Sequence, residues 1–515
     1  MEQTKIKIRC EIFPLPGVEL NGEQKIKDHI NLSGSSPNIG FNPIGELYVD
    51  KHASDGIIVA CLKPGIHPSK EEADLLKANG VKAYSYNLIE PALYAAANSQ
   101  QVEAIGYVPK IPKGFNLFGV AAGIKQAQDA KDLAVIYSNE PCLWAGTFTK
   151  NLARAVCVEK NSQLHNAGGK VRALISNAGN ANACTGVEGE TNDKQMREVV
   201  AKKFQLNADE VLSASTGKIG VQLPIEKVIN TVNDLGVPKS EIQSVIDFAE
   251  AILTTDLVLK ISQDSKSNML GFTKGSGMIM PNMATMLAYI ISDLKVQGLN
   301  DEESMQEFFR EALSRAVAQS FNLISVDGDT STNDMVIFMS NLQGKEISQE
   351  EFKTSLEEIC KDLAFKIVAD GEGLTKIIQL KLSGSISKMA FDLKPNLEKI
   401  GRKIINSPLV KTAIFGNDPN WGRIIASAGQ AAAEHEIKLD TNEMSLSILG
   451  HEVFTKGMPT EFIQNEENKA QLVGLMKKNK IIEIDLSIHD GKHAVTMFGN
   501  DLSHDYIKIN AEYST

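Results

Sequence analysis

Cysteine is scarce in this chain, and the few cysteines are far apart. There are six in 515 residues, at positions 10, 61, 142, 157, 184 and 360. A small secreted scaffold needs a much denser set to build a disulfide framework. No two of them have the Cys-x-x-Cys spacing that is typical of a structural zinc site. The sequence therefore excludes a disulfide framework and predicts no zinc site of that kind.

Long hydrophobic runs are also missing. No stretch of 18 apolar residues is present to cross a bilayer as a helix. The first residues, MEQTKIKIRCEIF, lack the continuous apolar centre of a secretory signal peptide. We therefore expect a protein of the reducing cytoplasm that has no membrane partner.

Positive charge is in deficit, since 53 Lys and Arg face 64 Asp and Glu, for a net charge of -11. Nucleic acids and anionic membranes are bound by basic surfaces, so the sequence argues against a protein dedicated to either. The negative net charge does not exclude small anionic substrates, because a single lysine can bind them. The hydrophobic share of 43% is that of an ordinary globular protein, and the length predicts two to four domains at about 100–200 residues each.

The first segment extends to residue 108, and a linker with Pro109, Pro112 and Gly114 follows it. Within this segment, Ser69 and Glu72 form a capping box that predicts a helix over residues 71–79. Apolar runs predict strands over residues 56–62 and 102–108. We expect a small α/β segment over residues 1–108.

After residue 115, apolar runs alternate with helical patterns and with loops rich in Gly and Asn. The runs predict strands over residues 133–137 and 172–176, and the alternation after residue 481 predicts a half-buried strand over 482–488. Apolar residues at three- and four-residue spacing predict a helix over 305–316, with Asn300 or Asp301 near its start. Together these elements predict an α+β fold built in layers.

Five loops combine small, polar and Gly residues between apolar strands. Each one alone is compatible with a tight turn, but five of them in one chain favour a functional site on a rigid scaffold. They are SNAGNANACTG (176–186), SASTGKIG (213–220), TKGSGMIMPNMATML (273–287), SVDGDTSTND (325–334) and FGNDPNWGR (415–423).

The third loop carries two candidate chemistries. A phosphate loop is disfavoured, because Lys274 precedes its glycines and the first Gly of the phosphate-loop pattern is missing. Ala284 followed by Thr285 suits an N→O acyl shift that breaks the chain between them. The new α-amine of Thr285, with a reference pKa near 8, could then act as base for its own hydroxyl. A structural threonine in a core strand is the alternative.

Residues from about 109 to 515 resemble the ornithine acetyltransferase (glutamate N-acetyltransferase) family of arginine biosynthesis. The resemblance rests on long motifs in the same order: KGFNLFGVAAGIK (113–125), NAGNANACTG, STGKIGVQLP (215–224), KGSGMIMPNMATML, SVDGDTSTND, DGEGLTK (370–376), GNDPNWGRI and the terminal INAEYST. It implies an αββα layered sandwich of the ornithine acetyltransferase and DmpA type. It also implies self-cleavage into an α chain over 109–284 and a β chain over 285–515, assembled as an α2β2 heterotetramer.

The resemblance assigns roles to individual residues. Thr285 is the nucleophile, and Thr216 and Gly217 form the oxyanion hole, where one preorganised donor is worth on the order of 3 kcal/mol. Lys274 binds the α-carboxylate of the acetylated amino acid, and Glu372 binds the ornithine ammonium. The implied substrate site comprises Thr255, Lys274, Thr285, Glu372, Asn510 and Thr515, with Thr254 as an alternative to Thr255.

The implied reaction has two half-reactions and uses no cofactor or metal. N2-acetyl-L-ornithine acetylates Thr285 and L-glutamate then takes the acetyl group, while acetyl-CoA is left open as another donor. A hydrolase of the same processed-threonine design is the alternative. Four polar residues suggest a metal loop but lack the ending of an EF-hand, and the family uses no metal; they are Asp327, Asp329, Asn333 and Asp334.

The N-terminal segment departs from this family. DHINLSG (28–34) and PGIHPSKEEADLLKANGVKAYSYN (64–87) resemble parts of purine nucleoside phosphorylases. The phosphate-binding portion of that family has no counterpart, and His67-Pro68-Ser69 replaces its Tyr-Glu-Thr triplet. We therefore expect a truncated module that docks on or regulates the transferase, with nucleoside binding as the alternative.

Overall fold

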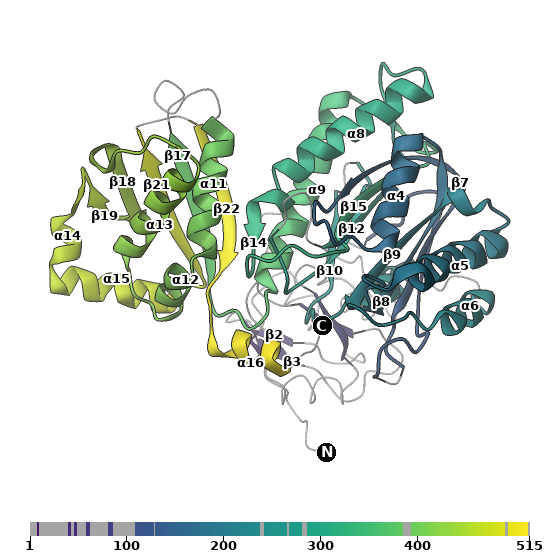
Figure 1. The fold of residues 1–515 in the computed structure, drawn as a ribbon, viewed down its shortest axis with the longest axis horizontal. Helices are drawn as coiled ribbons and strands as arrows, with labels where there is room; N and C mark the ends of the chain where they lie inside the picture. Colours follow the sequence, from purple (N-terminus) through teal and green to yellow (C-terminus); the bar gives the residue numbers. More distant parts are fainter. Residues whose placement is uncertain are drawn as a thin grey trace. The chain divides into compact units, whose positions relative to one another are not determined.

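The computed structural model describes residues 109–512 except residue 128 and residues 237–240, 265–266, 281–285, 385–392 and 490–492, together with five short strands before residue 109. The chain forms two compact units that interleave along the sequence (Figure 1). Unit 1 comprises residues 1–274, 286–316 and 332–366, and unit 2 comprises residues 275–285, 317–331 and 367–515.

The strands before residue 109 form two small sheets. β1 (Ile8–Arg9), β3 (Glu46–Tyr48) and β2 (Gly40–Asn42) pair in that order, antiparallel. β4 (Ile58–Cys61) pairs in parallel with β5 (Val81–Ser85), so the strand predicted over 56–62 is confirmed. The helix predicted over 71–79 and the strand predicted over 102–108 lie outside the described residues.

Unit 1 contains two sheets that share one long strand, β7 (Leu133–Phe148). The first half of β7 pairs with β6 and β8, its register shifts between Tyr137 and Cys142, and its last residues pair with β15. The strands predicted over 133–137 and 172–176 are confirmed as parts of β7 and β8. The first sheet holds β6 (Phe115–Val120), β7, β8 (Val171–Asn180) and β9 (Val211–Lys218); the second holds β10 (Lys260–Gln263), β11 (Leu270–Lys274), β12 (Leu287–Ser292), β15 (Met335–Ser340) and the end of β7.

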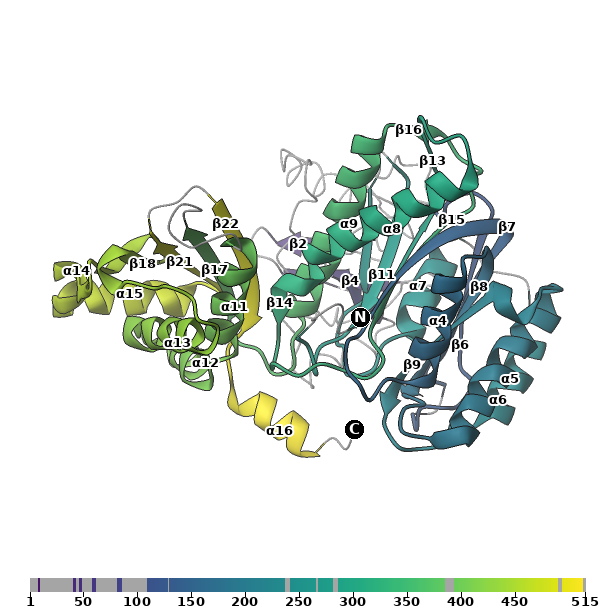
Figure 2. The ribbon, with the colours of Figure 1, turned by 45° about the horizontal axis from the view of Figure 1, so that its top comes forward.

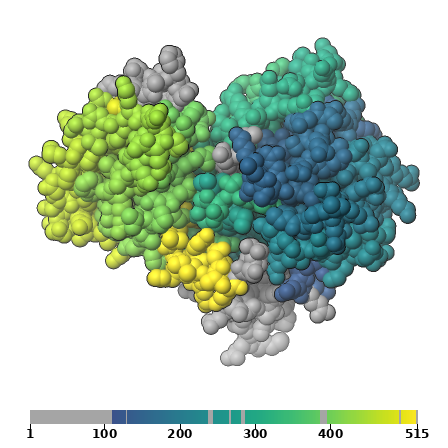
Figure 3. All heavy atoms as spheres, viewed as in Figure 1, coloured from purple at the N-terminus to yellow at the C-terminus, as the bar shows by residue number. Residues whose placement is uncertain are grey.

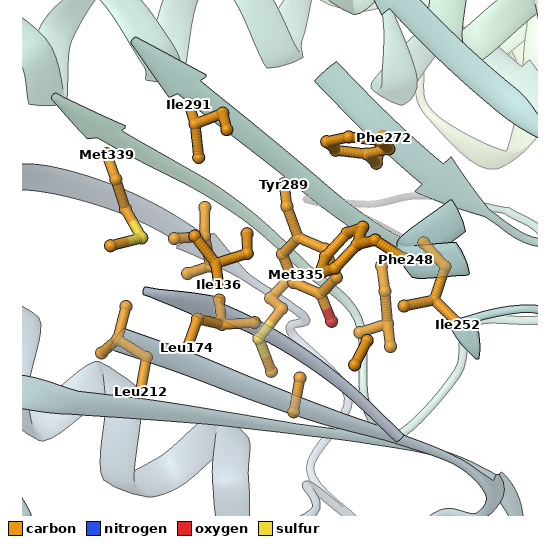
Figure 4. Packing of buried hydrophobic residues seen from close by; sticks show 14 of the residues in the cluster. Ile136, Leu174, Leu212, Phe248, Ile252, Phe272, Tyr289, Ile291, Met335 and Met339 are labelled. Carbon is orange, nitrogen blue, oxygen red and sulfur yellow. The ribbon is translucent and has the colours of Figure 1, made fainter. Parts of the chain in front are cut away.

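The two sheets pack face to face through a shared apolar core. Figure 4 shows Leu174 and Leu212 of the first sheet on one side of this core, with Tyr289, Met335 and Met339 of the second sheet on the other. The Tyr289 hydroxyl also donates to the Ser176 hydroxyl of β8 across the same gap, at 2.9 Å. Alternate residues of each strand therefore face inward, as expected for aligned sheets.

Helices cover the two outer faces. Apolar residues of α5 and α6 pack on the outer side of the first sheet, and Phe309 of α8 and Phe352 of α9 both contact Phe338 on the outer side of the second. Unit 1 is therefore an αββα sandwich, as predicted. Its helices are α4 (Val156–Ala167), α5 (Gly186–Phe204), α6 (Ile225–Asn233), α7 (Glu241–Ala251), α8 (Glu302–Ala318) and α9 (Gln349–Ala369), with short strands β13 (Lys295–Val296) and β16 (Glu346–Ile347).

Helix α8 confirms the helix predicted over 305–316. Its predicted apolar residues are all buried, including Phe309 and Leu313. Asp301 caps its first turn, since the Asp301 carboxylate accepts the backbone N–H of Ser304 at 2.7 Å. The choice between Asn300 and Asp301 thus resolves to Asp301.

Unit 2 is a seven-stranded sheet with helices packed on one face, drawn in green and yellow in Figure 2. The predicted alternation is confirmed in β21, where Ile482, Ile484 and Leu486 are buried and Glu483 is exposed. The strands run in the order β14 (Ile324–Ser325), β22 (His493–Asn500), β17 (Ile377–Gly384), β21 (Ile481–Ile488), β18 (Met444–Ile448), β19 (His451–Thr455), β20 (Met458–Pro459). The helices are α11 (Leu393–Asn406), α12 (Pro408–Phe415), α13 (Trp421–Glu434), α14 (Glu461–Gln464), α15 (Glu466–Lys478) and α16 (His504–Glu512).

Candidate active site

The end of β9 carries the predicted oxyanion residues Thr216 and Gly217. Gly217 has a φ of +133° and pairs with Gly179 of β8, which also has a positive φ. A Cβ on Gly217 would lie 2.3 Å from the backbone carbon of Gly179. Only glycine fits this conformation and this close approach, so the pattern Ser-Thr-Gly places a bare backbone beside the Thr216 hydroxyl.

Lys274 meets Thr216 inside unit 1. Lys274 is the last residue of β11, and its ammonium Nζ lies 3.0 Å from Thr216 Oγ1. Both residues are about nine-tenths buried. Leu287, the ladder partner of Lys274, stands two residues after Thr285 in the chain. The structure therefore brings together two of the predicted site residues from opposite sheets.

A buried ion pair that we did not predict lies near Lys274. The carboxylate of Asp256 accepts a hydrogen bond from Lys260 Nζ at 2.6 Å, and both side chains are fully buried. Burial alone would raise the pKa of Asp256, but the charges of Lys260 and Lys274 outweigh it, so the pKa lies well below its ordinary value. Asp256 stays ionised and helps to compensate the buried lysine charges.

The predicted Thr255 precedes Asp256 directly and is half-buried. The neighbouring Thr254 donates its backbone N–H to the Asp256 carboxylate at 3.0 Å. Thr254 therefore supports the ion pair, while the assignment of Thr255 to the substrate site stays a prediction.

Two other predicted residues meet in unit 2. Asn510 of α16, a helix with no buried residue that lies on the molecular surface in yellow (Figure 3), donates from Nδ2 to the Glu372 carboxylate at 2.9 Å. The backbone N–H of Glu372 donates to the Ser276 carbonyl at 2.9 Å, and a Cβ on Gly277 would lie 2.3 Å from the Glu372 carboxylate. The glycine of the KGSG motif thus leaves room for this carboxylate.

Ala284, Thr285 and Thr515 lie outside the described residues. Their predicted roles as cleavage site, nucleophile and substrate contact therefore stay predictions. The domain boundary between residues 284 and 285 also stays a prediction, because cleavage is a covalent event that the compact units do not report.

The suspected metal loop has structural roles. The Asp327 carboxylate accepts the backbone N–H groups of Met278 and Ile279 at 2.7 and 2.8 Å. In unit 1, the side-chain amide of Asn333 donates to the carbonyls of Ala181 and Ser215 at 2.6 and 2.8 Å. The part of the chain that the structure describes contains no group of His, Cys, Asp and Glu suited to a metal ion.

The loop SNAGNANACTG supports the strand that carries Thr216. Ser215 donates its hydroxyl to the Asn177 side chain at 2.7 Å, and Asn177 donates to the Asn180 carbonyl at 2.8 Å. With Asn333, which donates to the Ser215 carbonyl, these buried amides hold the strand at the residue directly before Thr216. They were missed as functional residues, because asparagines in Gly-rich loops are equally typical of turns.

The layers and the buried polar cluster define the class of protein: an αββα sandwich whose candidate site lies at the ends of strands from its two facing sheets. A sequence model described as the ArgJ family matches residues 116–515. The chain belongs to the ArgJ family, as the motifs predicted. Residues 1–108 lie outside this match, and their resemblance to purine nucleoside phosphorylases stays a prediction.

Relatives align along most of the chain. "Arginine biosynthesis bifunctional protein ArgJ" of Bacillus anthracis is 38% identical over 417 residues, which are 78% of this chain and 96% of that protein. The protein of the same name from Thermus thermophilus is 36% identical, over 79% of this chain and 99% of that protein. A crystal structure titled as ornithine acetyltransferase complexed with ornithine, from Mycobacterium tuberculosis, is 34% identical and covers 34% of this chain and 94% of that chain, with a TM-score of 0.30.

No helix in the described residues is long and apolar enough to serve as a membrane span.

Proposed function

We propose that this chain is a glutamate N-acetyltransferase of arginine biosynthesis, which transfers acetyl from N2-acetyl-L-ornithine to L-glutamate through Thr285. Its relatives carry names from arginine biosynthesis, and they align along nearly their whole length. The observation that carries the proposal is the buried contact between Lys274 and Thr216, next to the positive-φ Gly217. The Thr216 hydroxyl, the Gly217 N–H and the Lys274 ammonium thus lie close together in the buried interior of unit 1.

The proposed reaction proceeds by two acyl transfers. The Thr285 hydroxyl attacks the acetyl carbonyl of acetylornithine, with the α-amine of Thr285 taking the proton. The resulting oxyanion receives hydrogen bonds from the Thr216 hydroxyl and the Gly217 N–H, the C–N bond breaks, and ornithine leaves with the proton. The amine of glutamate then attacks the acetyl-threonine ester, which releases N-acetylglutamate and restores the Thr285 hydroxyl.

The remaining residues would bind the substrates. In this proposal, Lys274 holds the α-carboxylate, Glu372 holds the ornithine ammonium, and Asn510 orients Glu372. The 2.9 Å contact between Asn510 and Glu372 supports the last assignment, because a donor fixes the carboxylate in one orientation. Thr255 and Thr515 complete the proposed substrate contacts.

The proposal includes processing and assembly. The chain cleaves itself between Ala284 and Thr285, and the two products assemble as α2β2 in the cytoplasm. Neither half-reaction needs a cofactor, because acetyl moves only between amines and a hydroxyl.

One experiment tests the processing. Intact-mass and N-terminal sequencing of the purified protein should show two chains, the second beginning at Thr285. Thr285→Ala should remain one chain of full mass, whereas the control Thr441→Ala, at an exposed threonine of unit 2, should be cut like the wild type. An uncut wild type that transfers acetyl at full rate would contradict the proposal.

A second experiment tests the reaction and separates it from hydrolysis. The enzyme is mixed with acetylornithine with and without glutamate, and ornithine release is followed. A transferase releases one ornithine per site and then stops until glutamate is added, whereas a hydrolase continues without it. The same assay with acetyl-CoA in place of acetylornithine shows whether it serves as a second donor.

A further inference from the structure

The contact between Lys274 and Thr216 has a definite direction. An ammonium group has three N–H donors and no acceptor, so Lys274 Nζ donates and Thr216 Oγ1 accepts. The hydroxyl hydrogen of Thr216 must therefore point away from Lys274. Among the described residues, no acceptor for this hydrogen is found, and the hydroxyl is free to donate to a ligand.

We propose that Lys274 is a positioning residue that acts through Thr216: its ammonium fixes the Thr216 hydroxyl as a donor toward the reacting carbonyl. This inference rests on the proposed function, and it adds a role for Lys274 that is independent of the α-carboxylate. A hydroxyl that accepts from a cation is also polarised, so it donates a stronger hydrogen bond to an oxyanion.

The surroundings of Lys274 keep this donor in place. Lys274 ends the fully buried strand β11, so its stem is held by the second sheet, while Thr216 is held by the first. The ionised Asp256, paired with Lys260 at 2.6 Å, supplies a negative charge that offsets the desolvation of the buried Lys274 ammonium. The contact therefore joins two rigid elements, which is what preorganisation requires.

The two roles of Lys274 predict different kinetics. If Lys274 only binds the α-carboxylate, Lys274→Met raises KM for acetylornithine and has no effect on N-acetyl-1,4-diaminobutane, which is acetylornithine without that carboxylate. If Lys274 acts through Thr216, the variant lowers the rate of acetyl-threonine formation with both substrates. We expect at least a tenfold loss in kcat with each.

A double-mutant cycle tests the coupling directly. Thr216→Val removes the hydroxyl and should lower kcat by about 10²–10³-fold, the usual effect of losing one oxyanion donor. Because Lys274 acts through that hydroxyl, the double variant should be no slower than Thr216→Val alone on N-acetyl-1,4-diaminobutane. Losses that multiply in the double variant, or an unchanged rate in Lys274→Met, would overturn the inference.

Two controls keep the cycle interpretable. Lys203→Met, at a half-buried lysine of unit 1 that bonds only the Asn233 carbonyl in the described residues, should leave both rates unchanged. If a site variant remains uncut, segments 1–284 and 285–515 are expressed together from separate start codons so that all variants have the same chains. A wild type without acetyl transfer contradicts the proposed function, whereas an active wild type with multiplying losses contradicts only the role of Lys274.

Discussion

Replacing Gly217 by alanine tests the geometry of the strand end most directly. The backbone at Gly217 has a φ of +133°, and an added Cβ would approach three backbone atoms of Gly179 and Asn180 at 2.3 to 2.7 Å. These atoms belong to the paired strand β8, so they cannot move aside as a flexible side chain would.

The expected cost has two parts. A residue with a Cβ loses roughly 1–2 kcal/mol of folding free energy when its φ is positive. Overpacking against a fixed neighbour adds about 1–3 kcal/mol. Gly168 provides the matched control, because its φ is +72° and no atom lies within 4 Å of its added Cβ. Gly168→Ala should therefore lose only the energy due to its positive φ, and none to overpacking.

Urea unfolding of both variants measures the difference. We expect the unit 1 transition of Gly217→Ala to lie below that of Gly168→Ala by about 1–3 kcal/mol in the free energy of unfolding. Gly217→Ala should also lose most of its acetyl transfer, while Gly168→Ala keeps it. Equal unfolding transitions for the two variants would refute the close approach of β8 and β9 at this point.

Three further predictions follow from buried polar groups. Asn333→Leu should lower the free energy of unfolding by about 2–3 kcal/mol, because the Ser215 and Ala181 carbonyls lose their donor. It should also lower kcat with little change in KM. Thermal unfolding and steady-state kinetics measure both effects, with Asn233→Leu at an exposed asparagine as the control. Asp327→Ala should slow chain cleavage, because the backbone N–H groups of Met278 and Ile279 lose their acceptor. Asp327→Asn keeps an acceptor oxygen and should slow cleavage less. Mass spectrometry of the chains over time measures both rates. Burial lowers the pKa of Lys411 to about 8, so unfolding takes up a proton between about pH 8 and 10. The free energy of unfolding of the wild type, relative to that of Lys411→Met, should therefore rise by up to about 1.4 kcal/mol per pH unit through this window. A difference between the two proteins that does not change with pH would refute this.

Local periodicity was sufficient to predict individual elements. The alternation in β21 and the apolar stripe of α8 depend only on which face is buried, so they can be read without knowing the neighbours. The course of β7 could not be predicted in this way. Its middle residues Asn139, Glu140 and Pro141 are exposed and look like a turn, yet they form an irregular part of one strand that passes from one sheet to the other. Only long-range pairing with β8 and β15 decides this.

The candidate site shows the same division. Family motifs identified Thr216 and Lys274, which are 58 residues apart in sequence, but their contact depends on the packing of two sheets. Asp256 and Lys260 were overlooked, because an Asp and a Lys four residues apart are typical of an exposed helical surface. Their side chains are instead fully buried, and burial is a property of the tertiary structure.

Burial also explains why this ion pair belongs near the site. A lysine that must stay charged inside a protein needs a compensating charge, and Asp256 is an ionised carboxylate that the charge of Lys274 reaches. Asp256 accepts a hydrogen bond from Lys260 at 2.6 Å, and Lys274 Nζ donates to Thr216 at 3.0 Å. The charges of Lys260 and Lys274 together hold the pKa of Asp256 well below its ordinary value, so this one carboxylate compensates two buried lysines. The Asp256–Lys260 pair is therefore part of the charge balance of the site that holds Lys274 and Thr216.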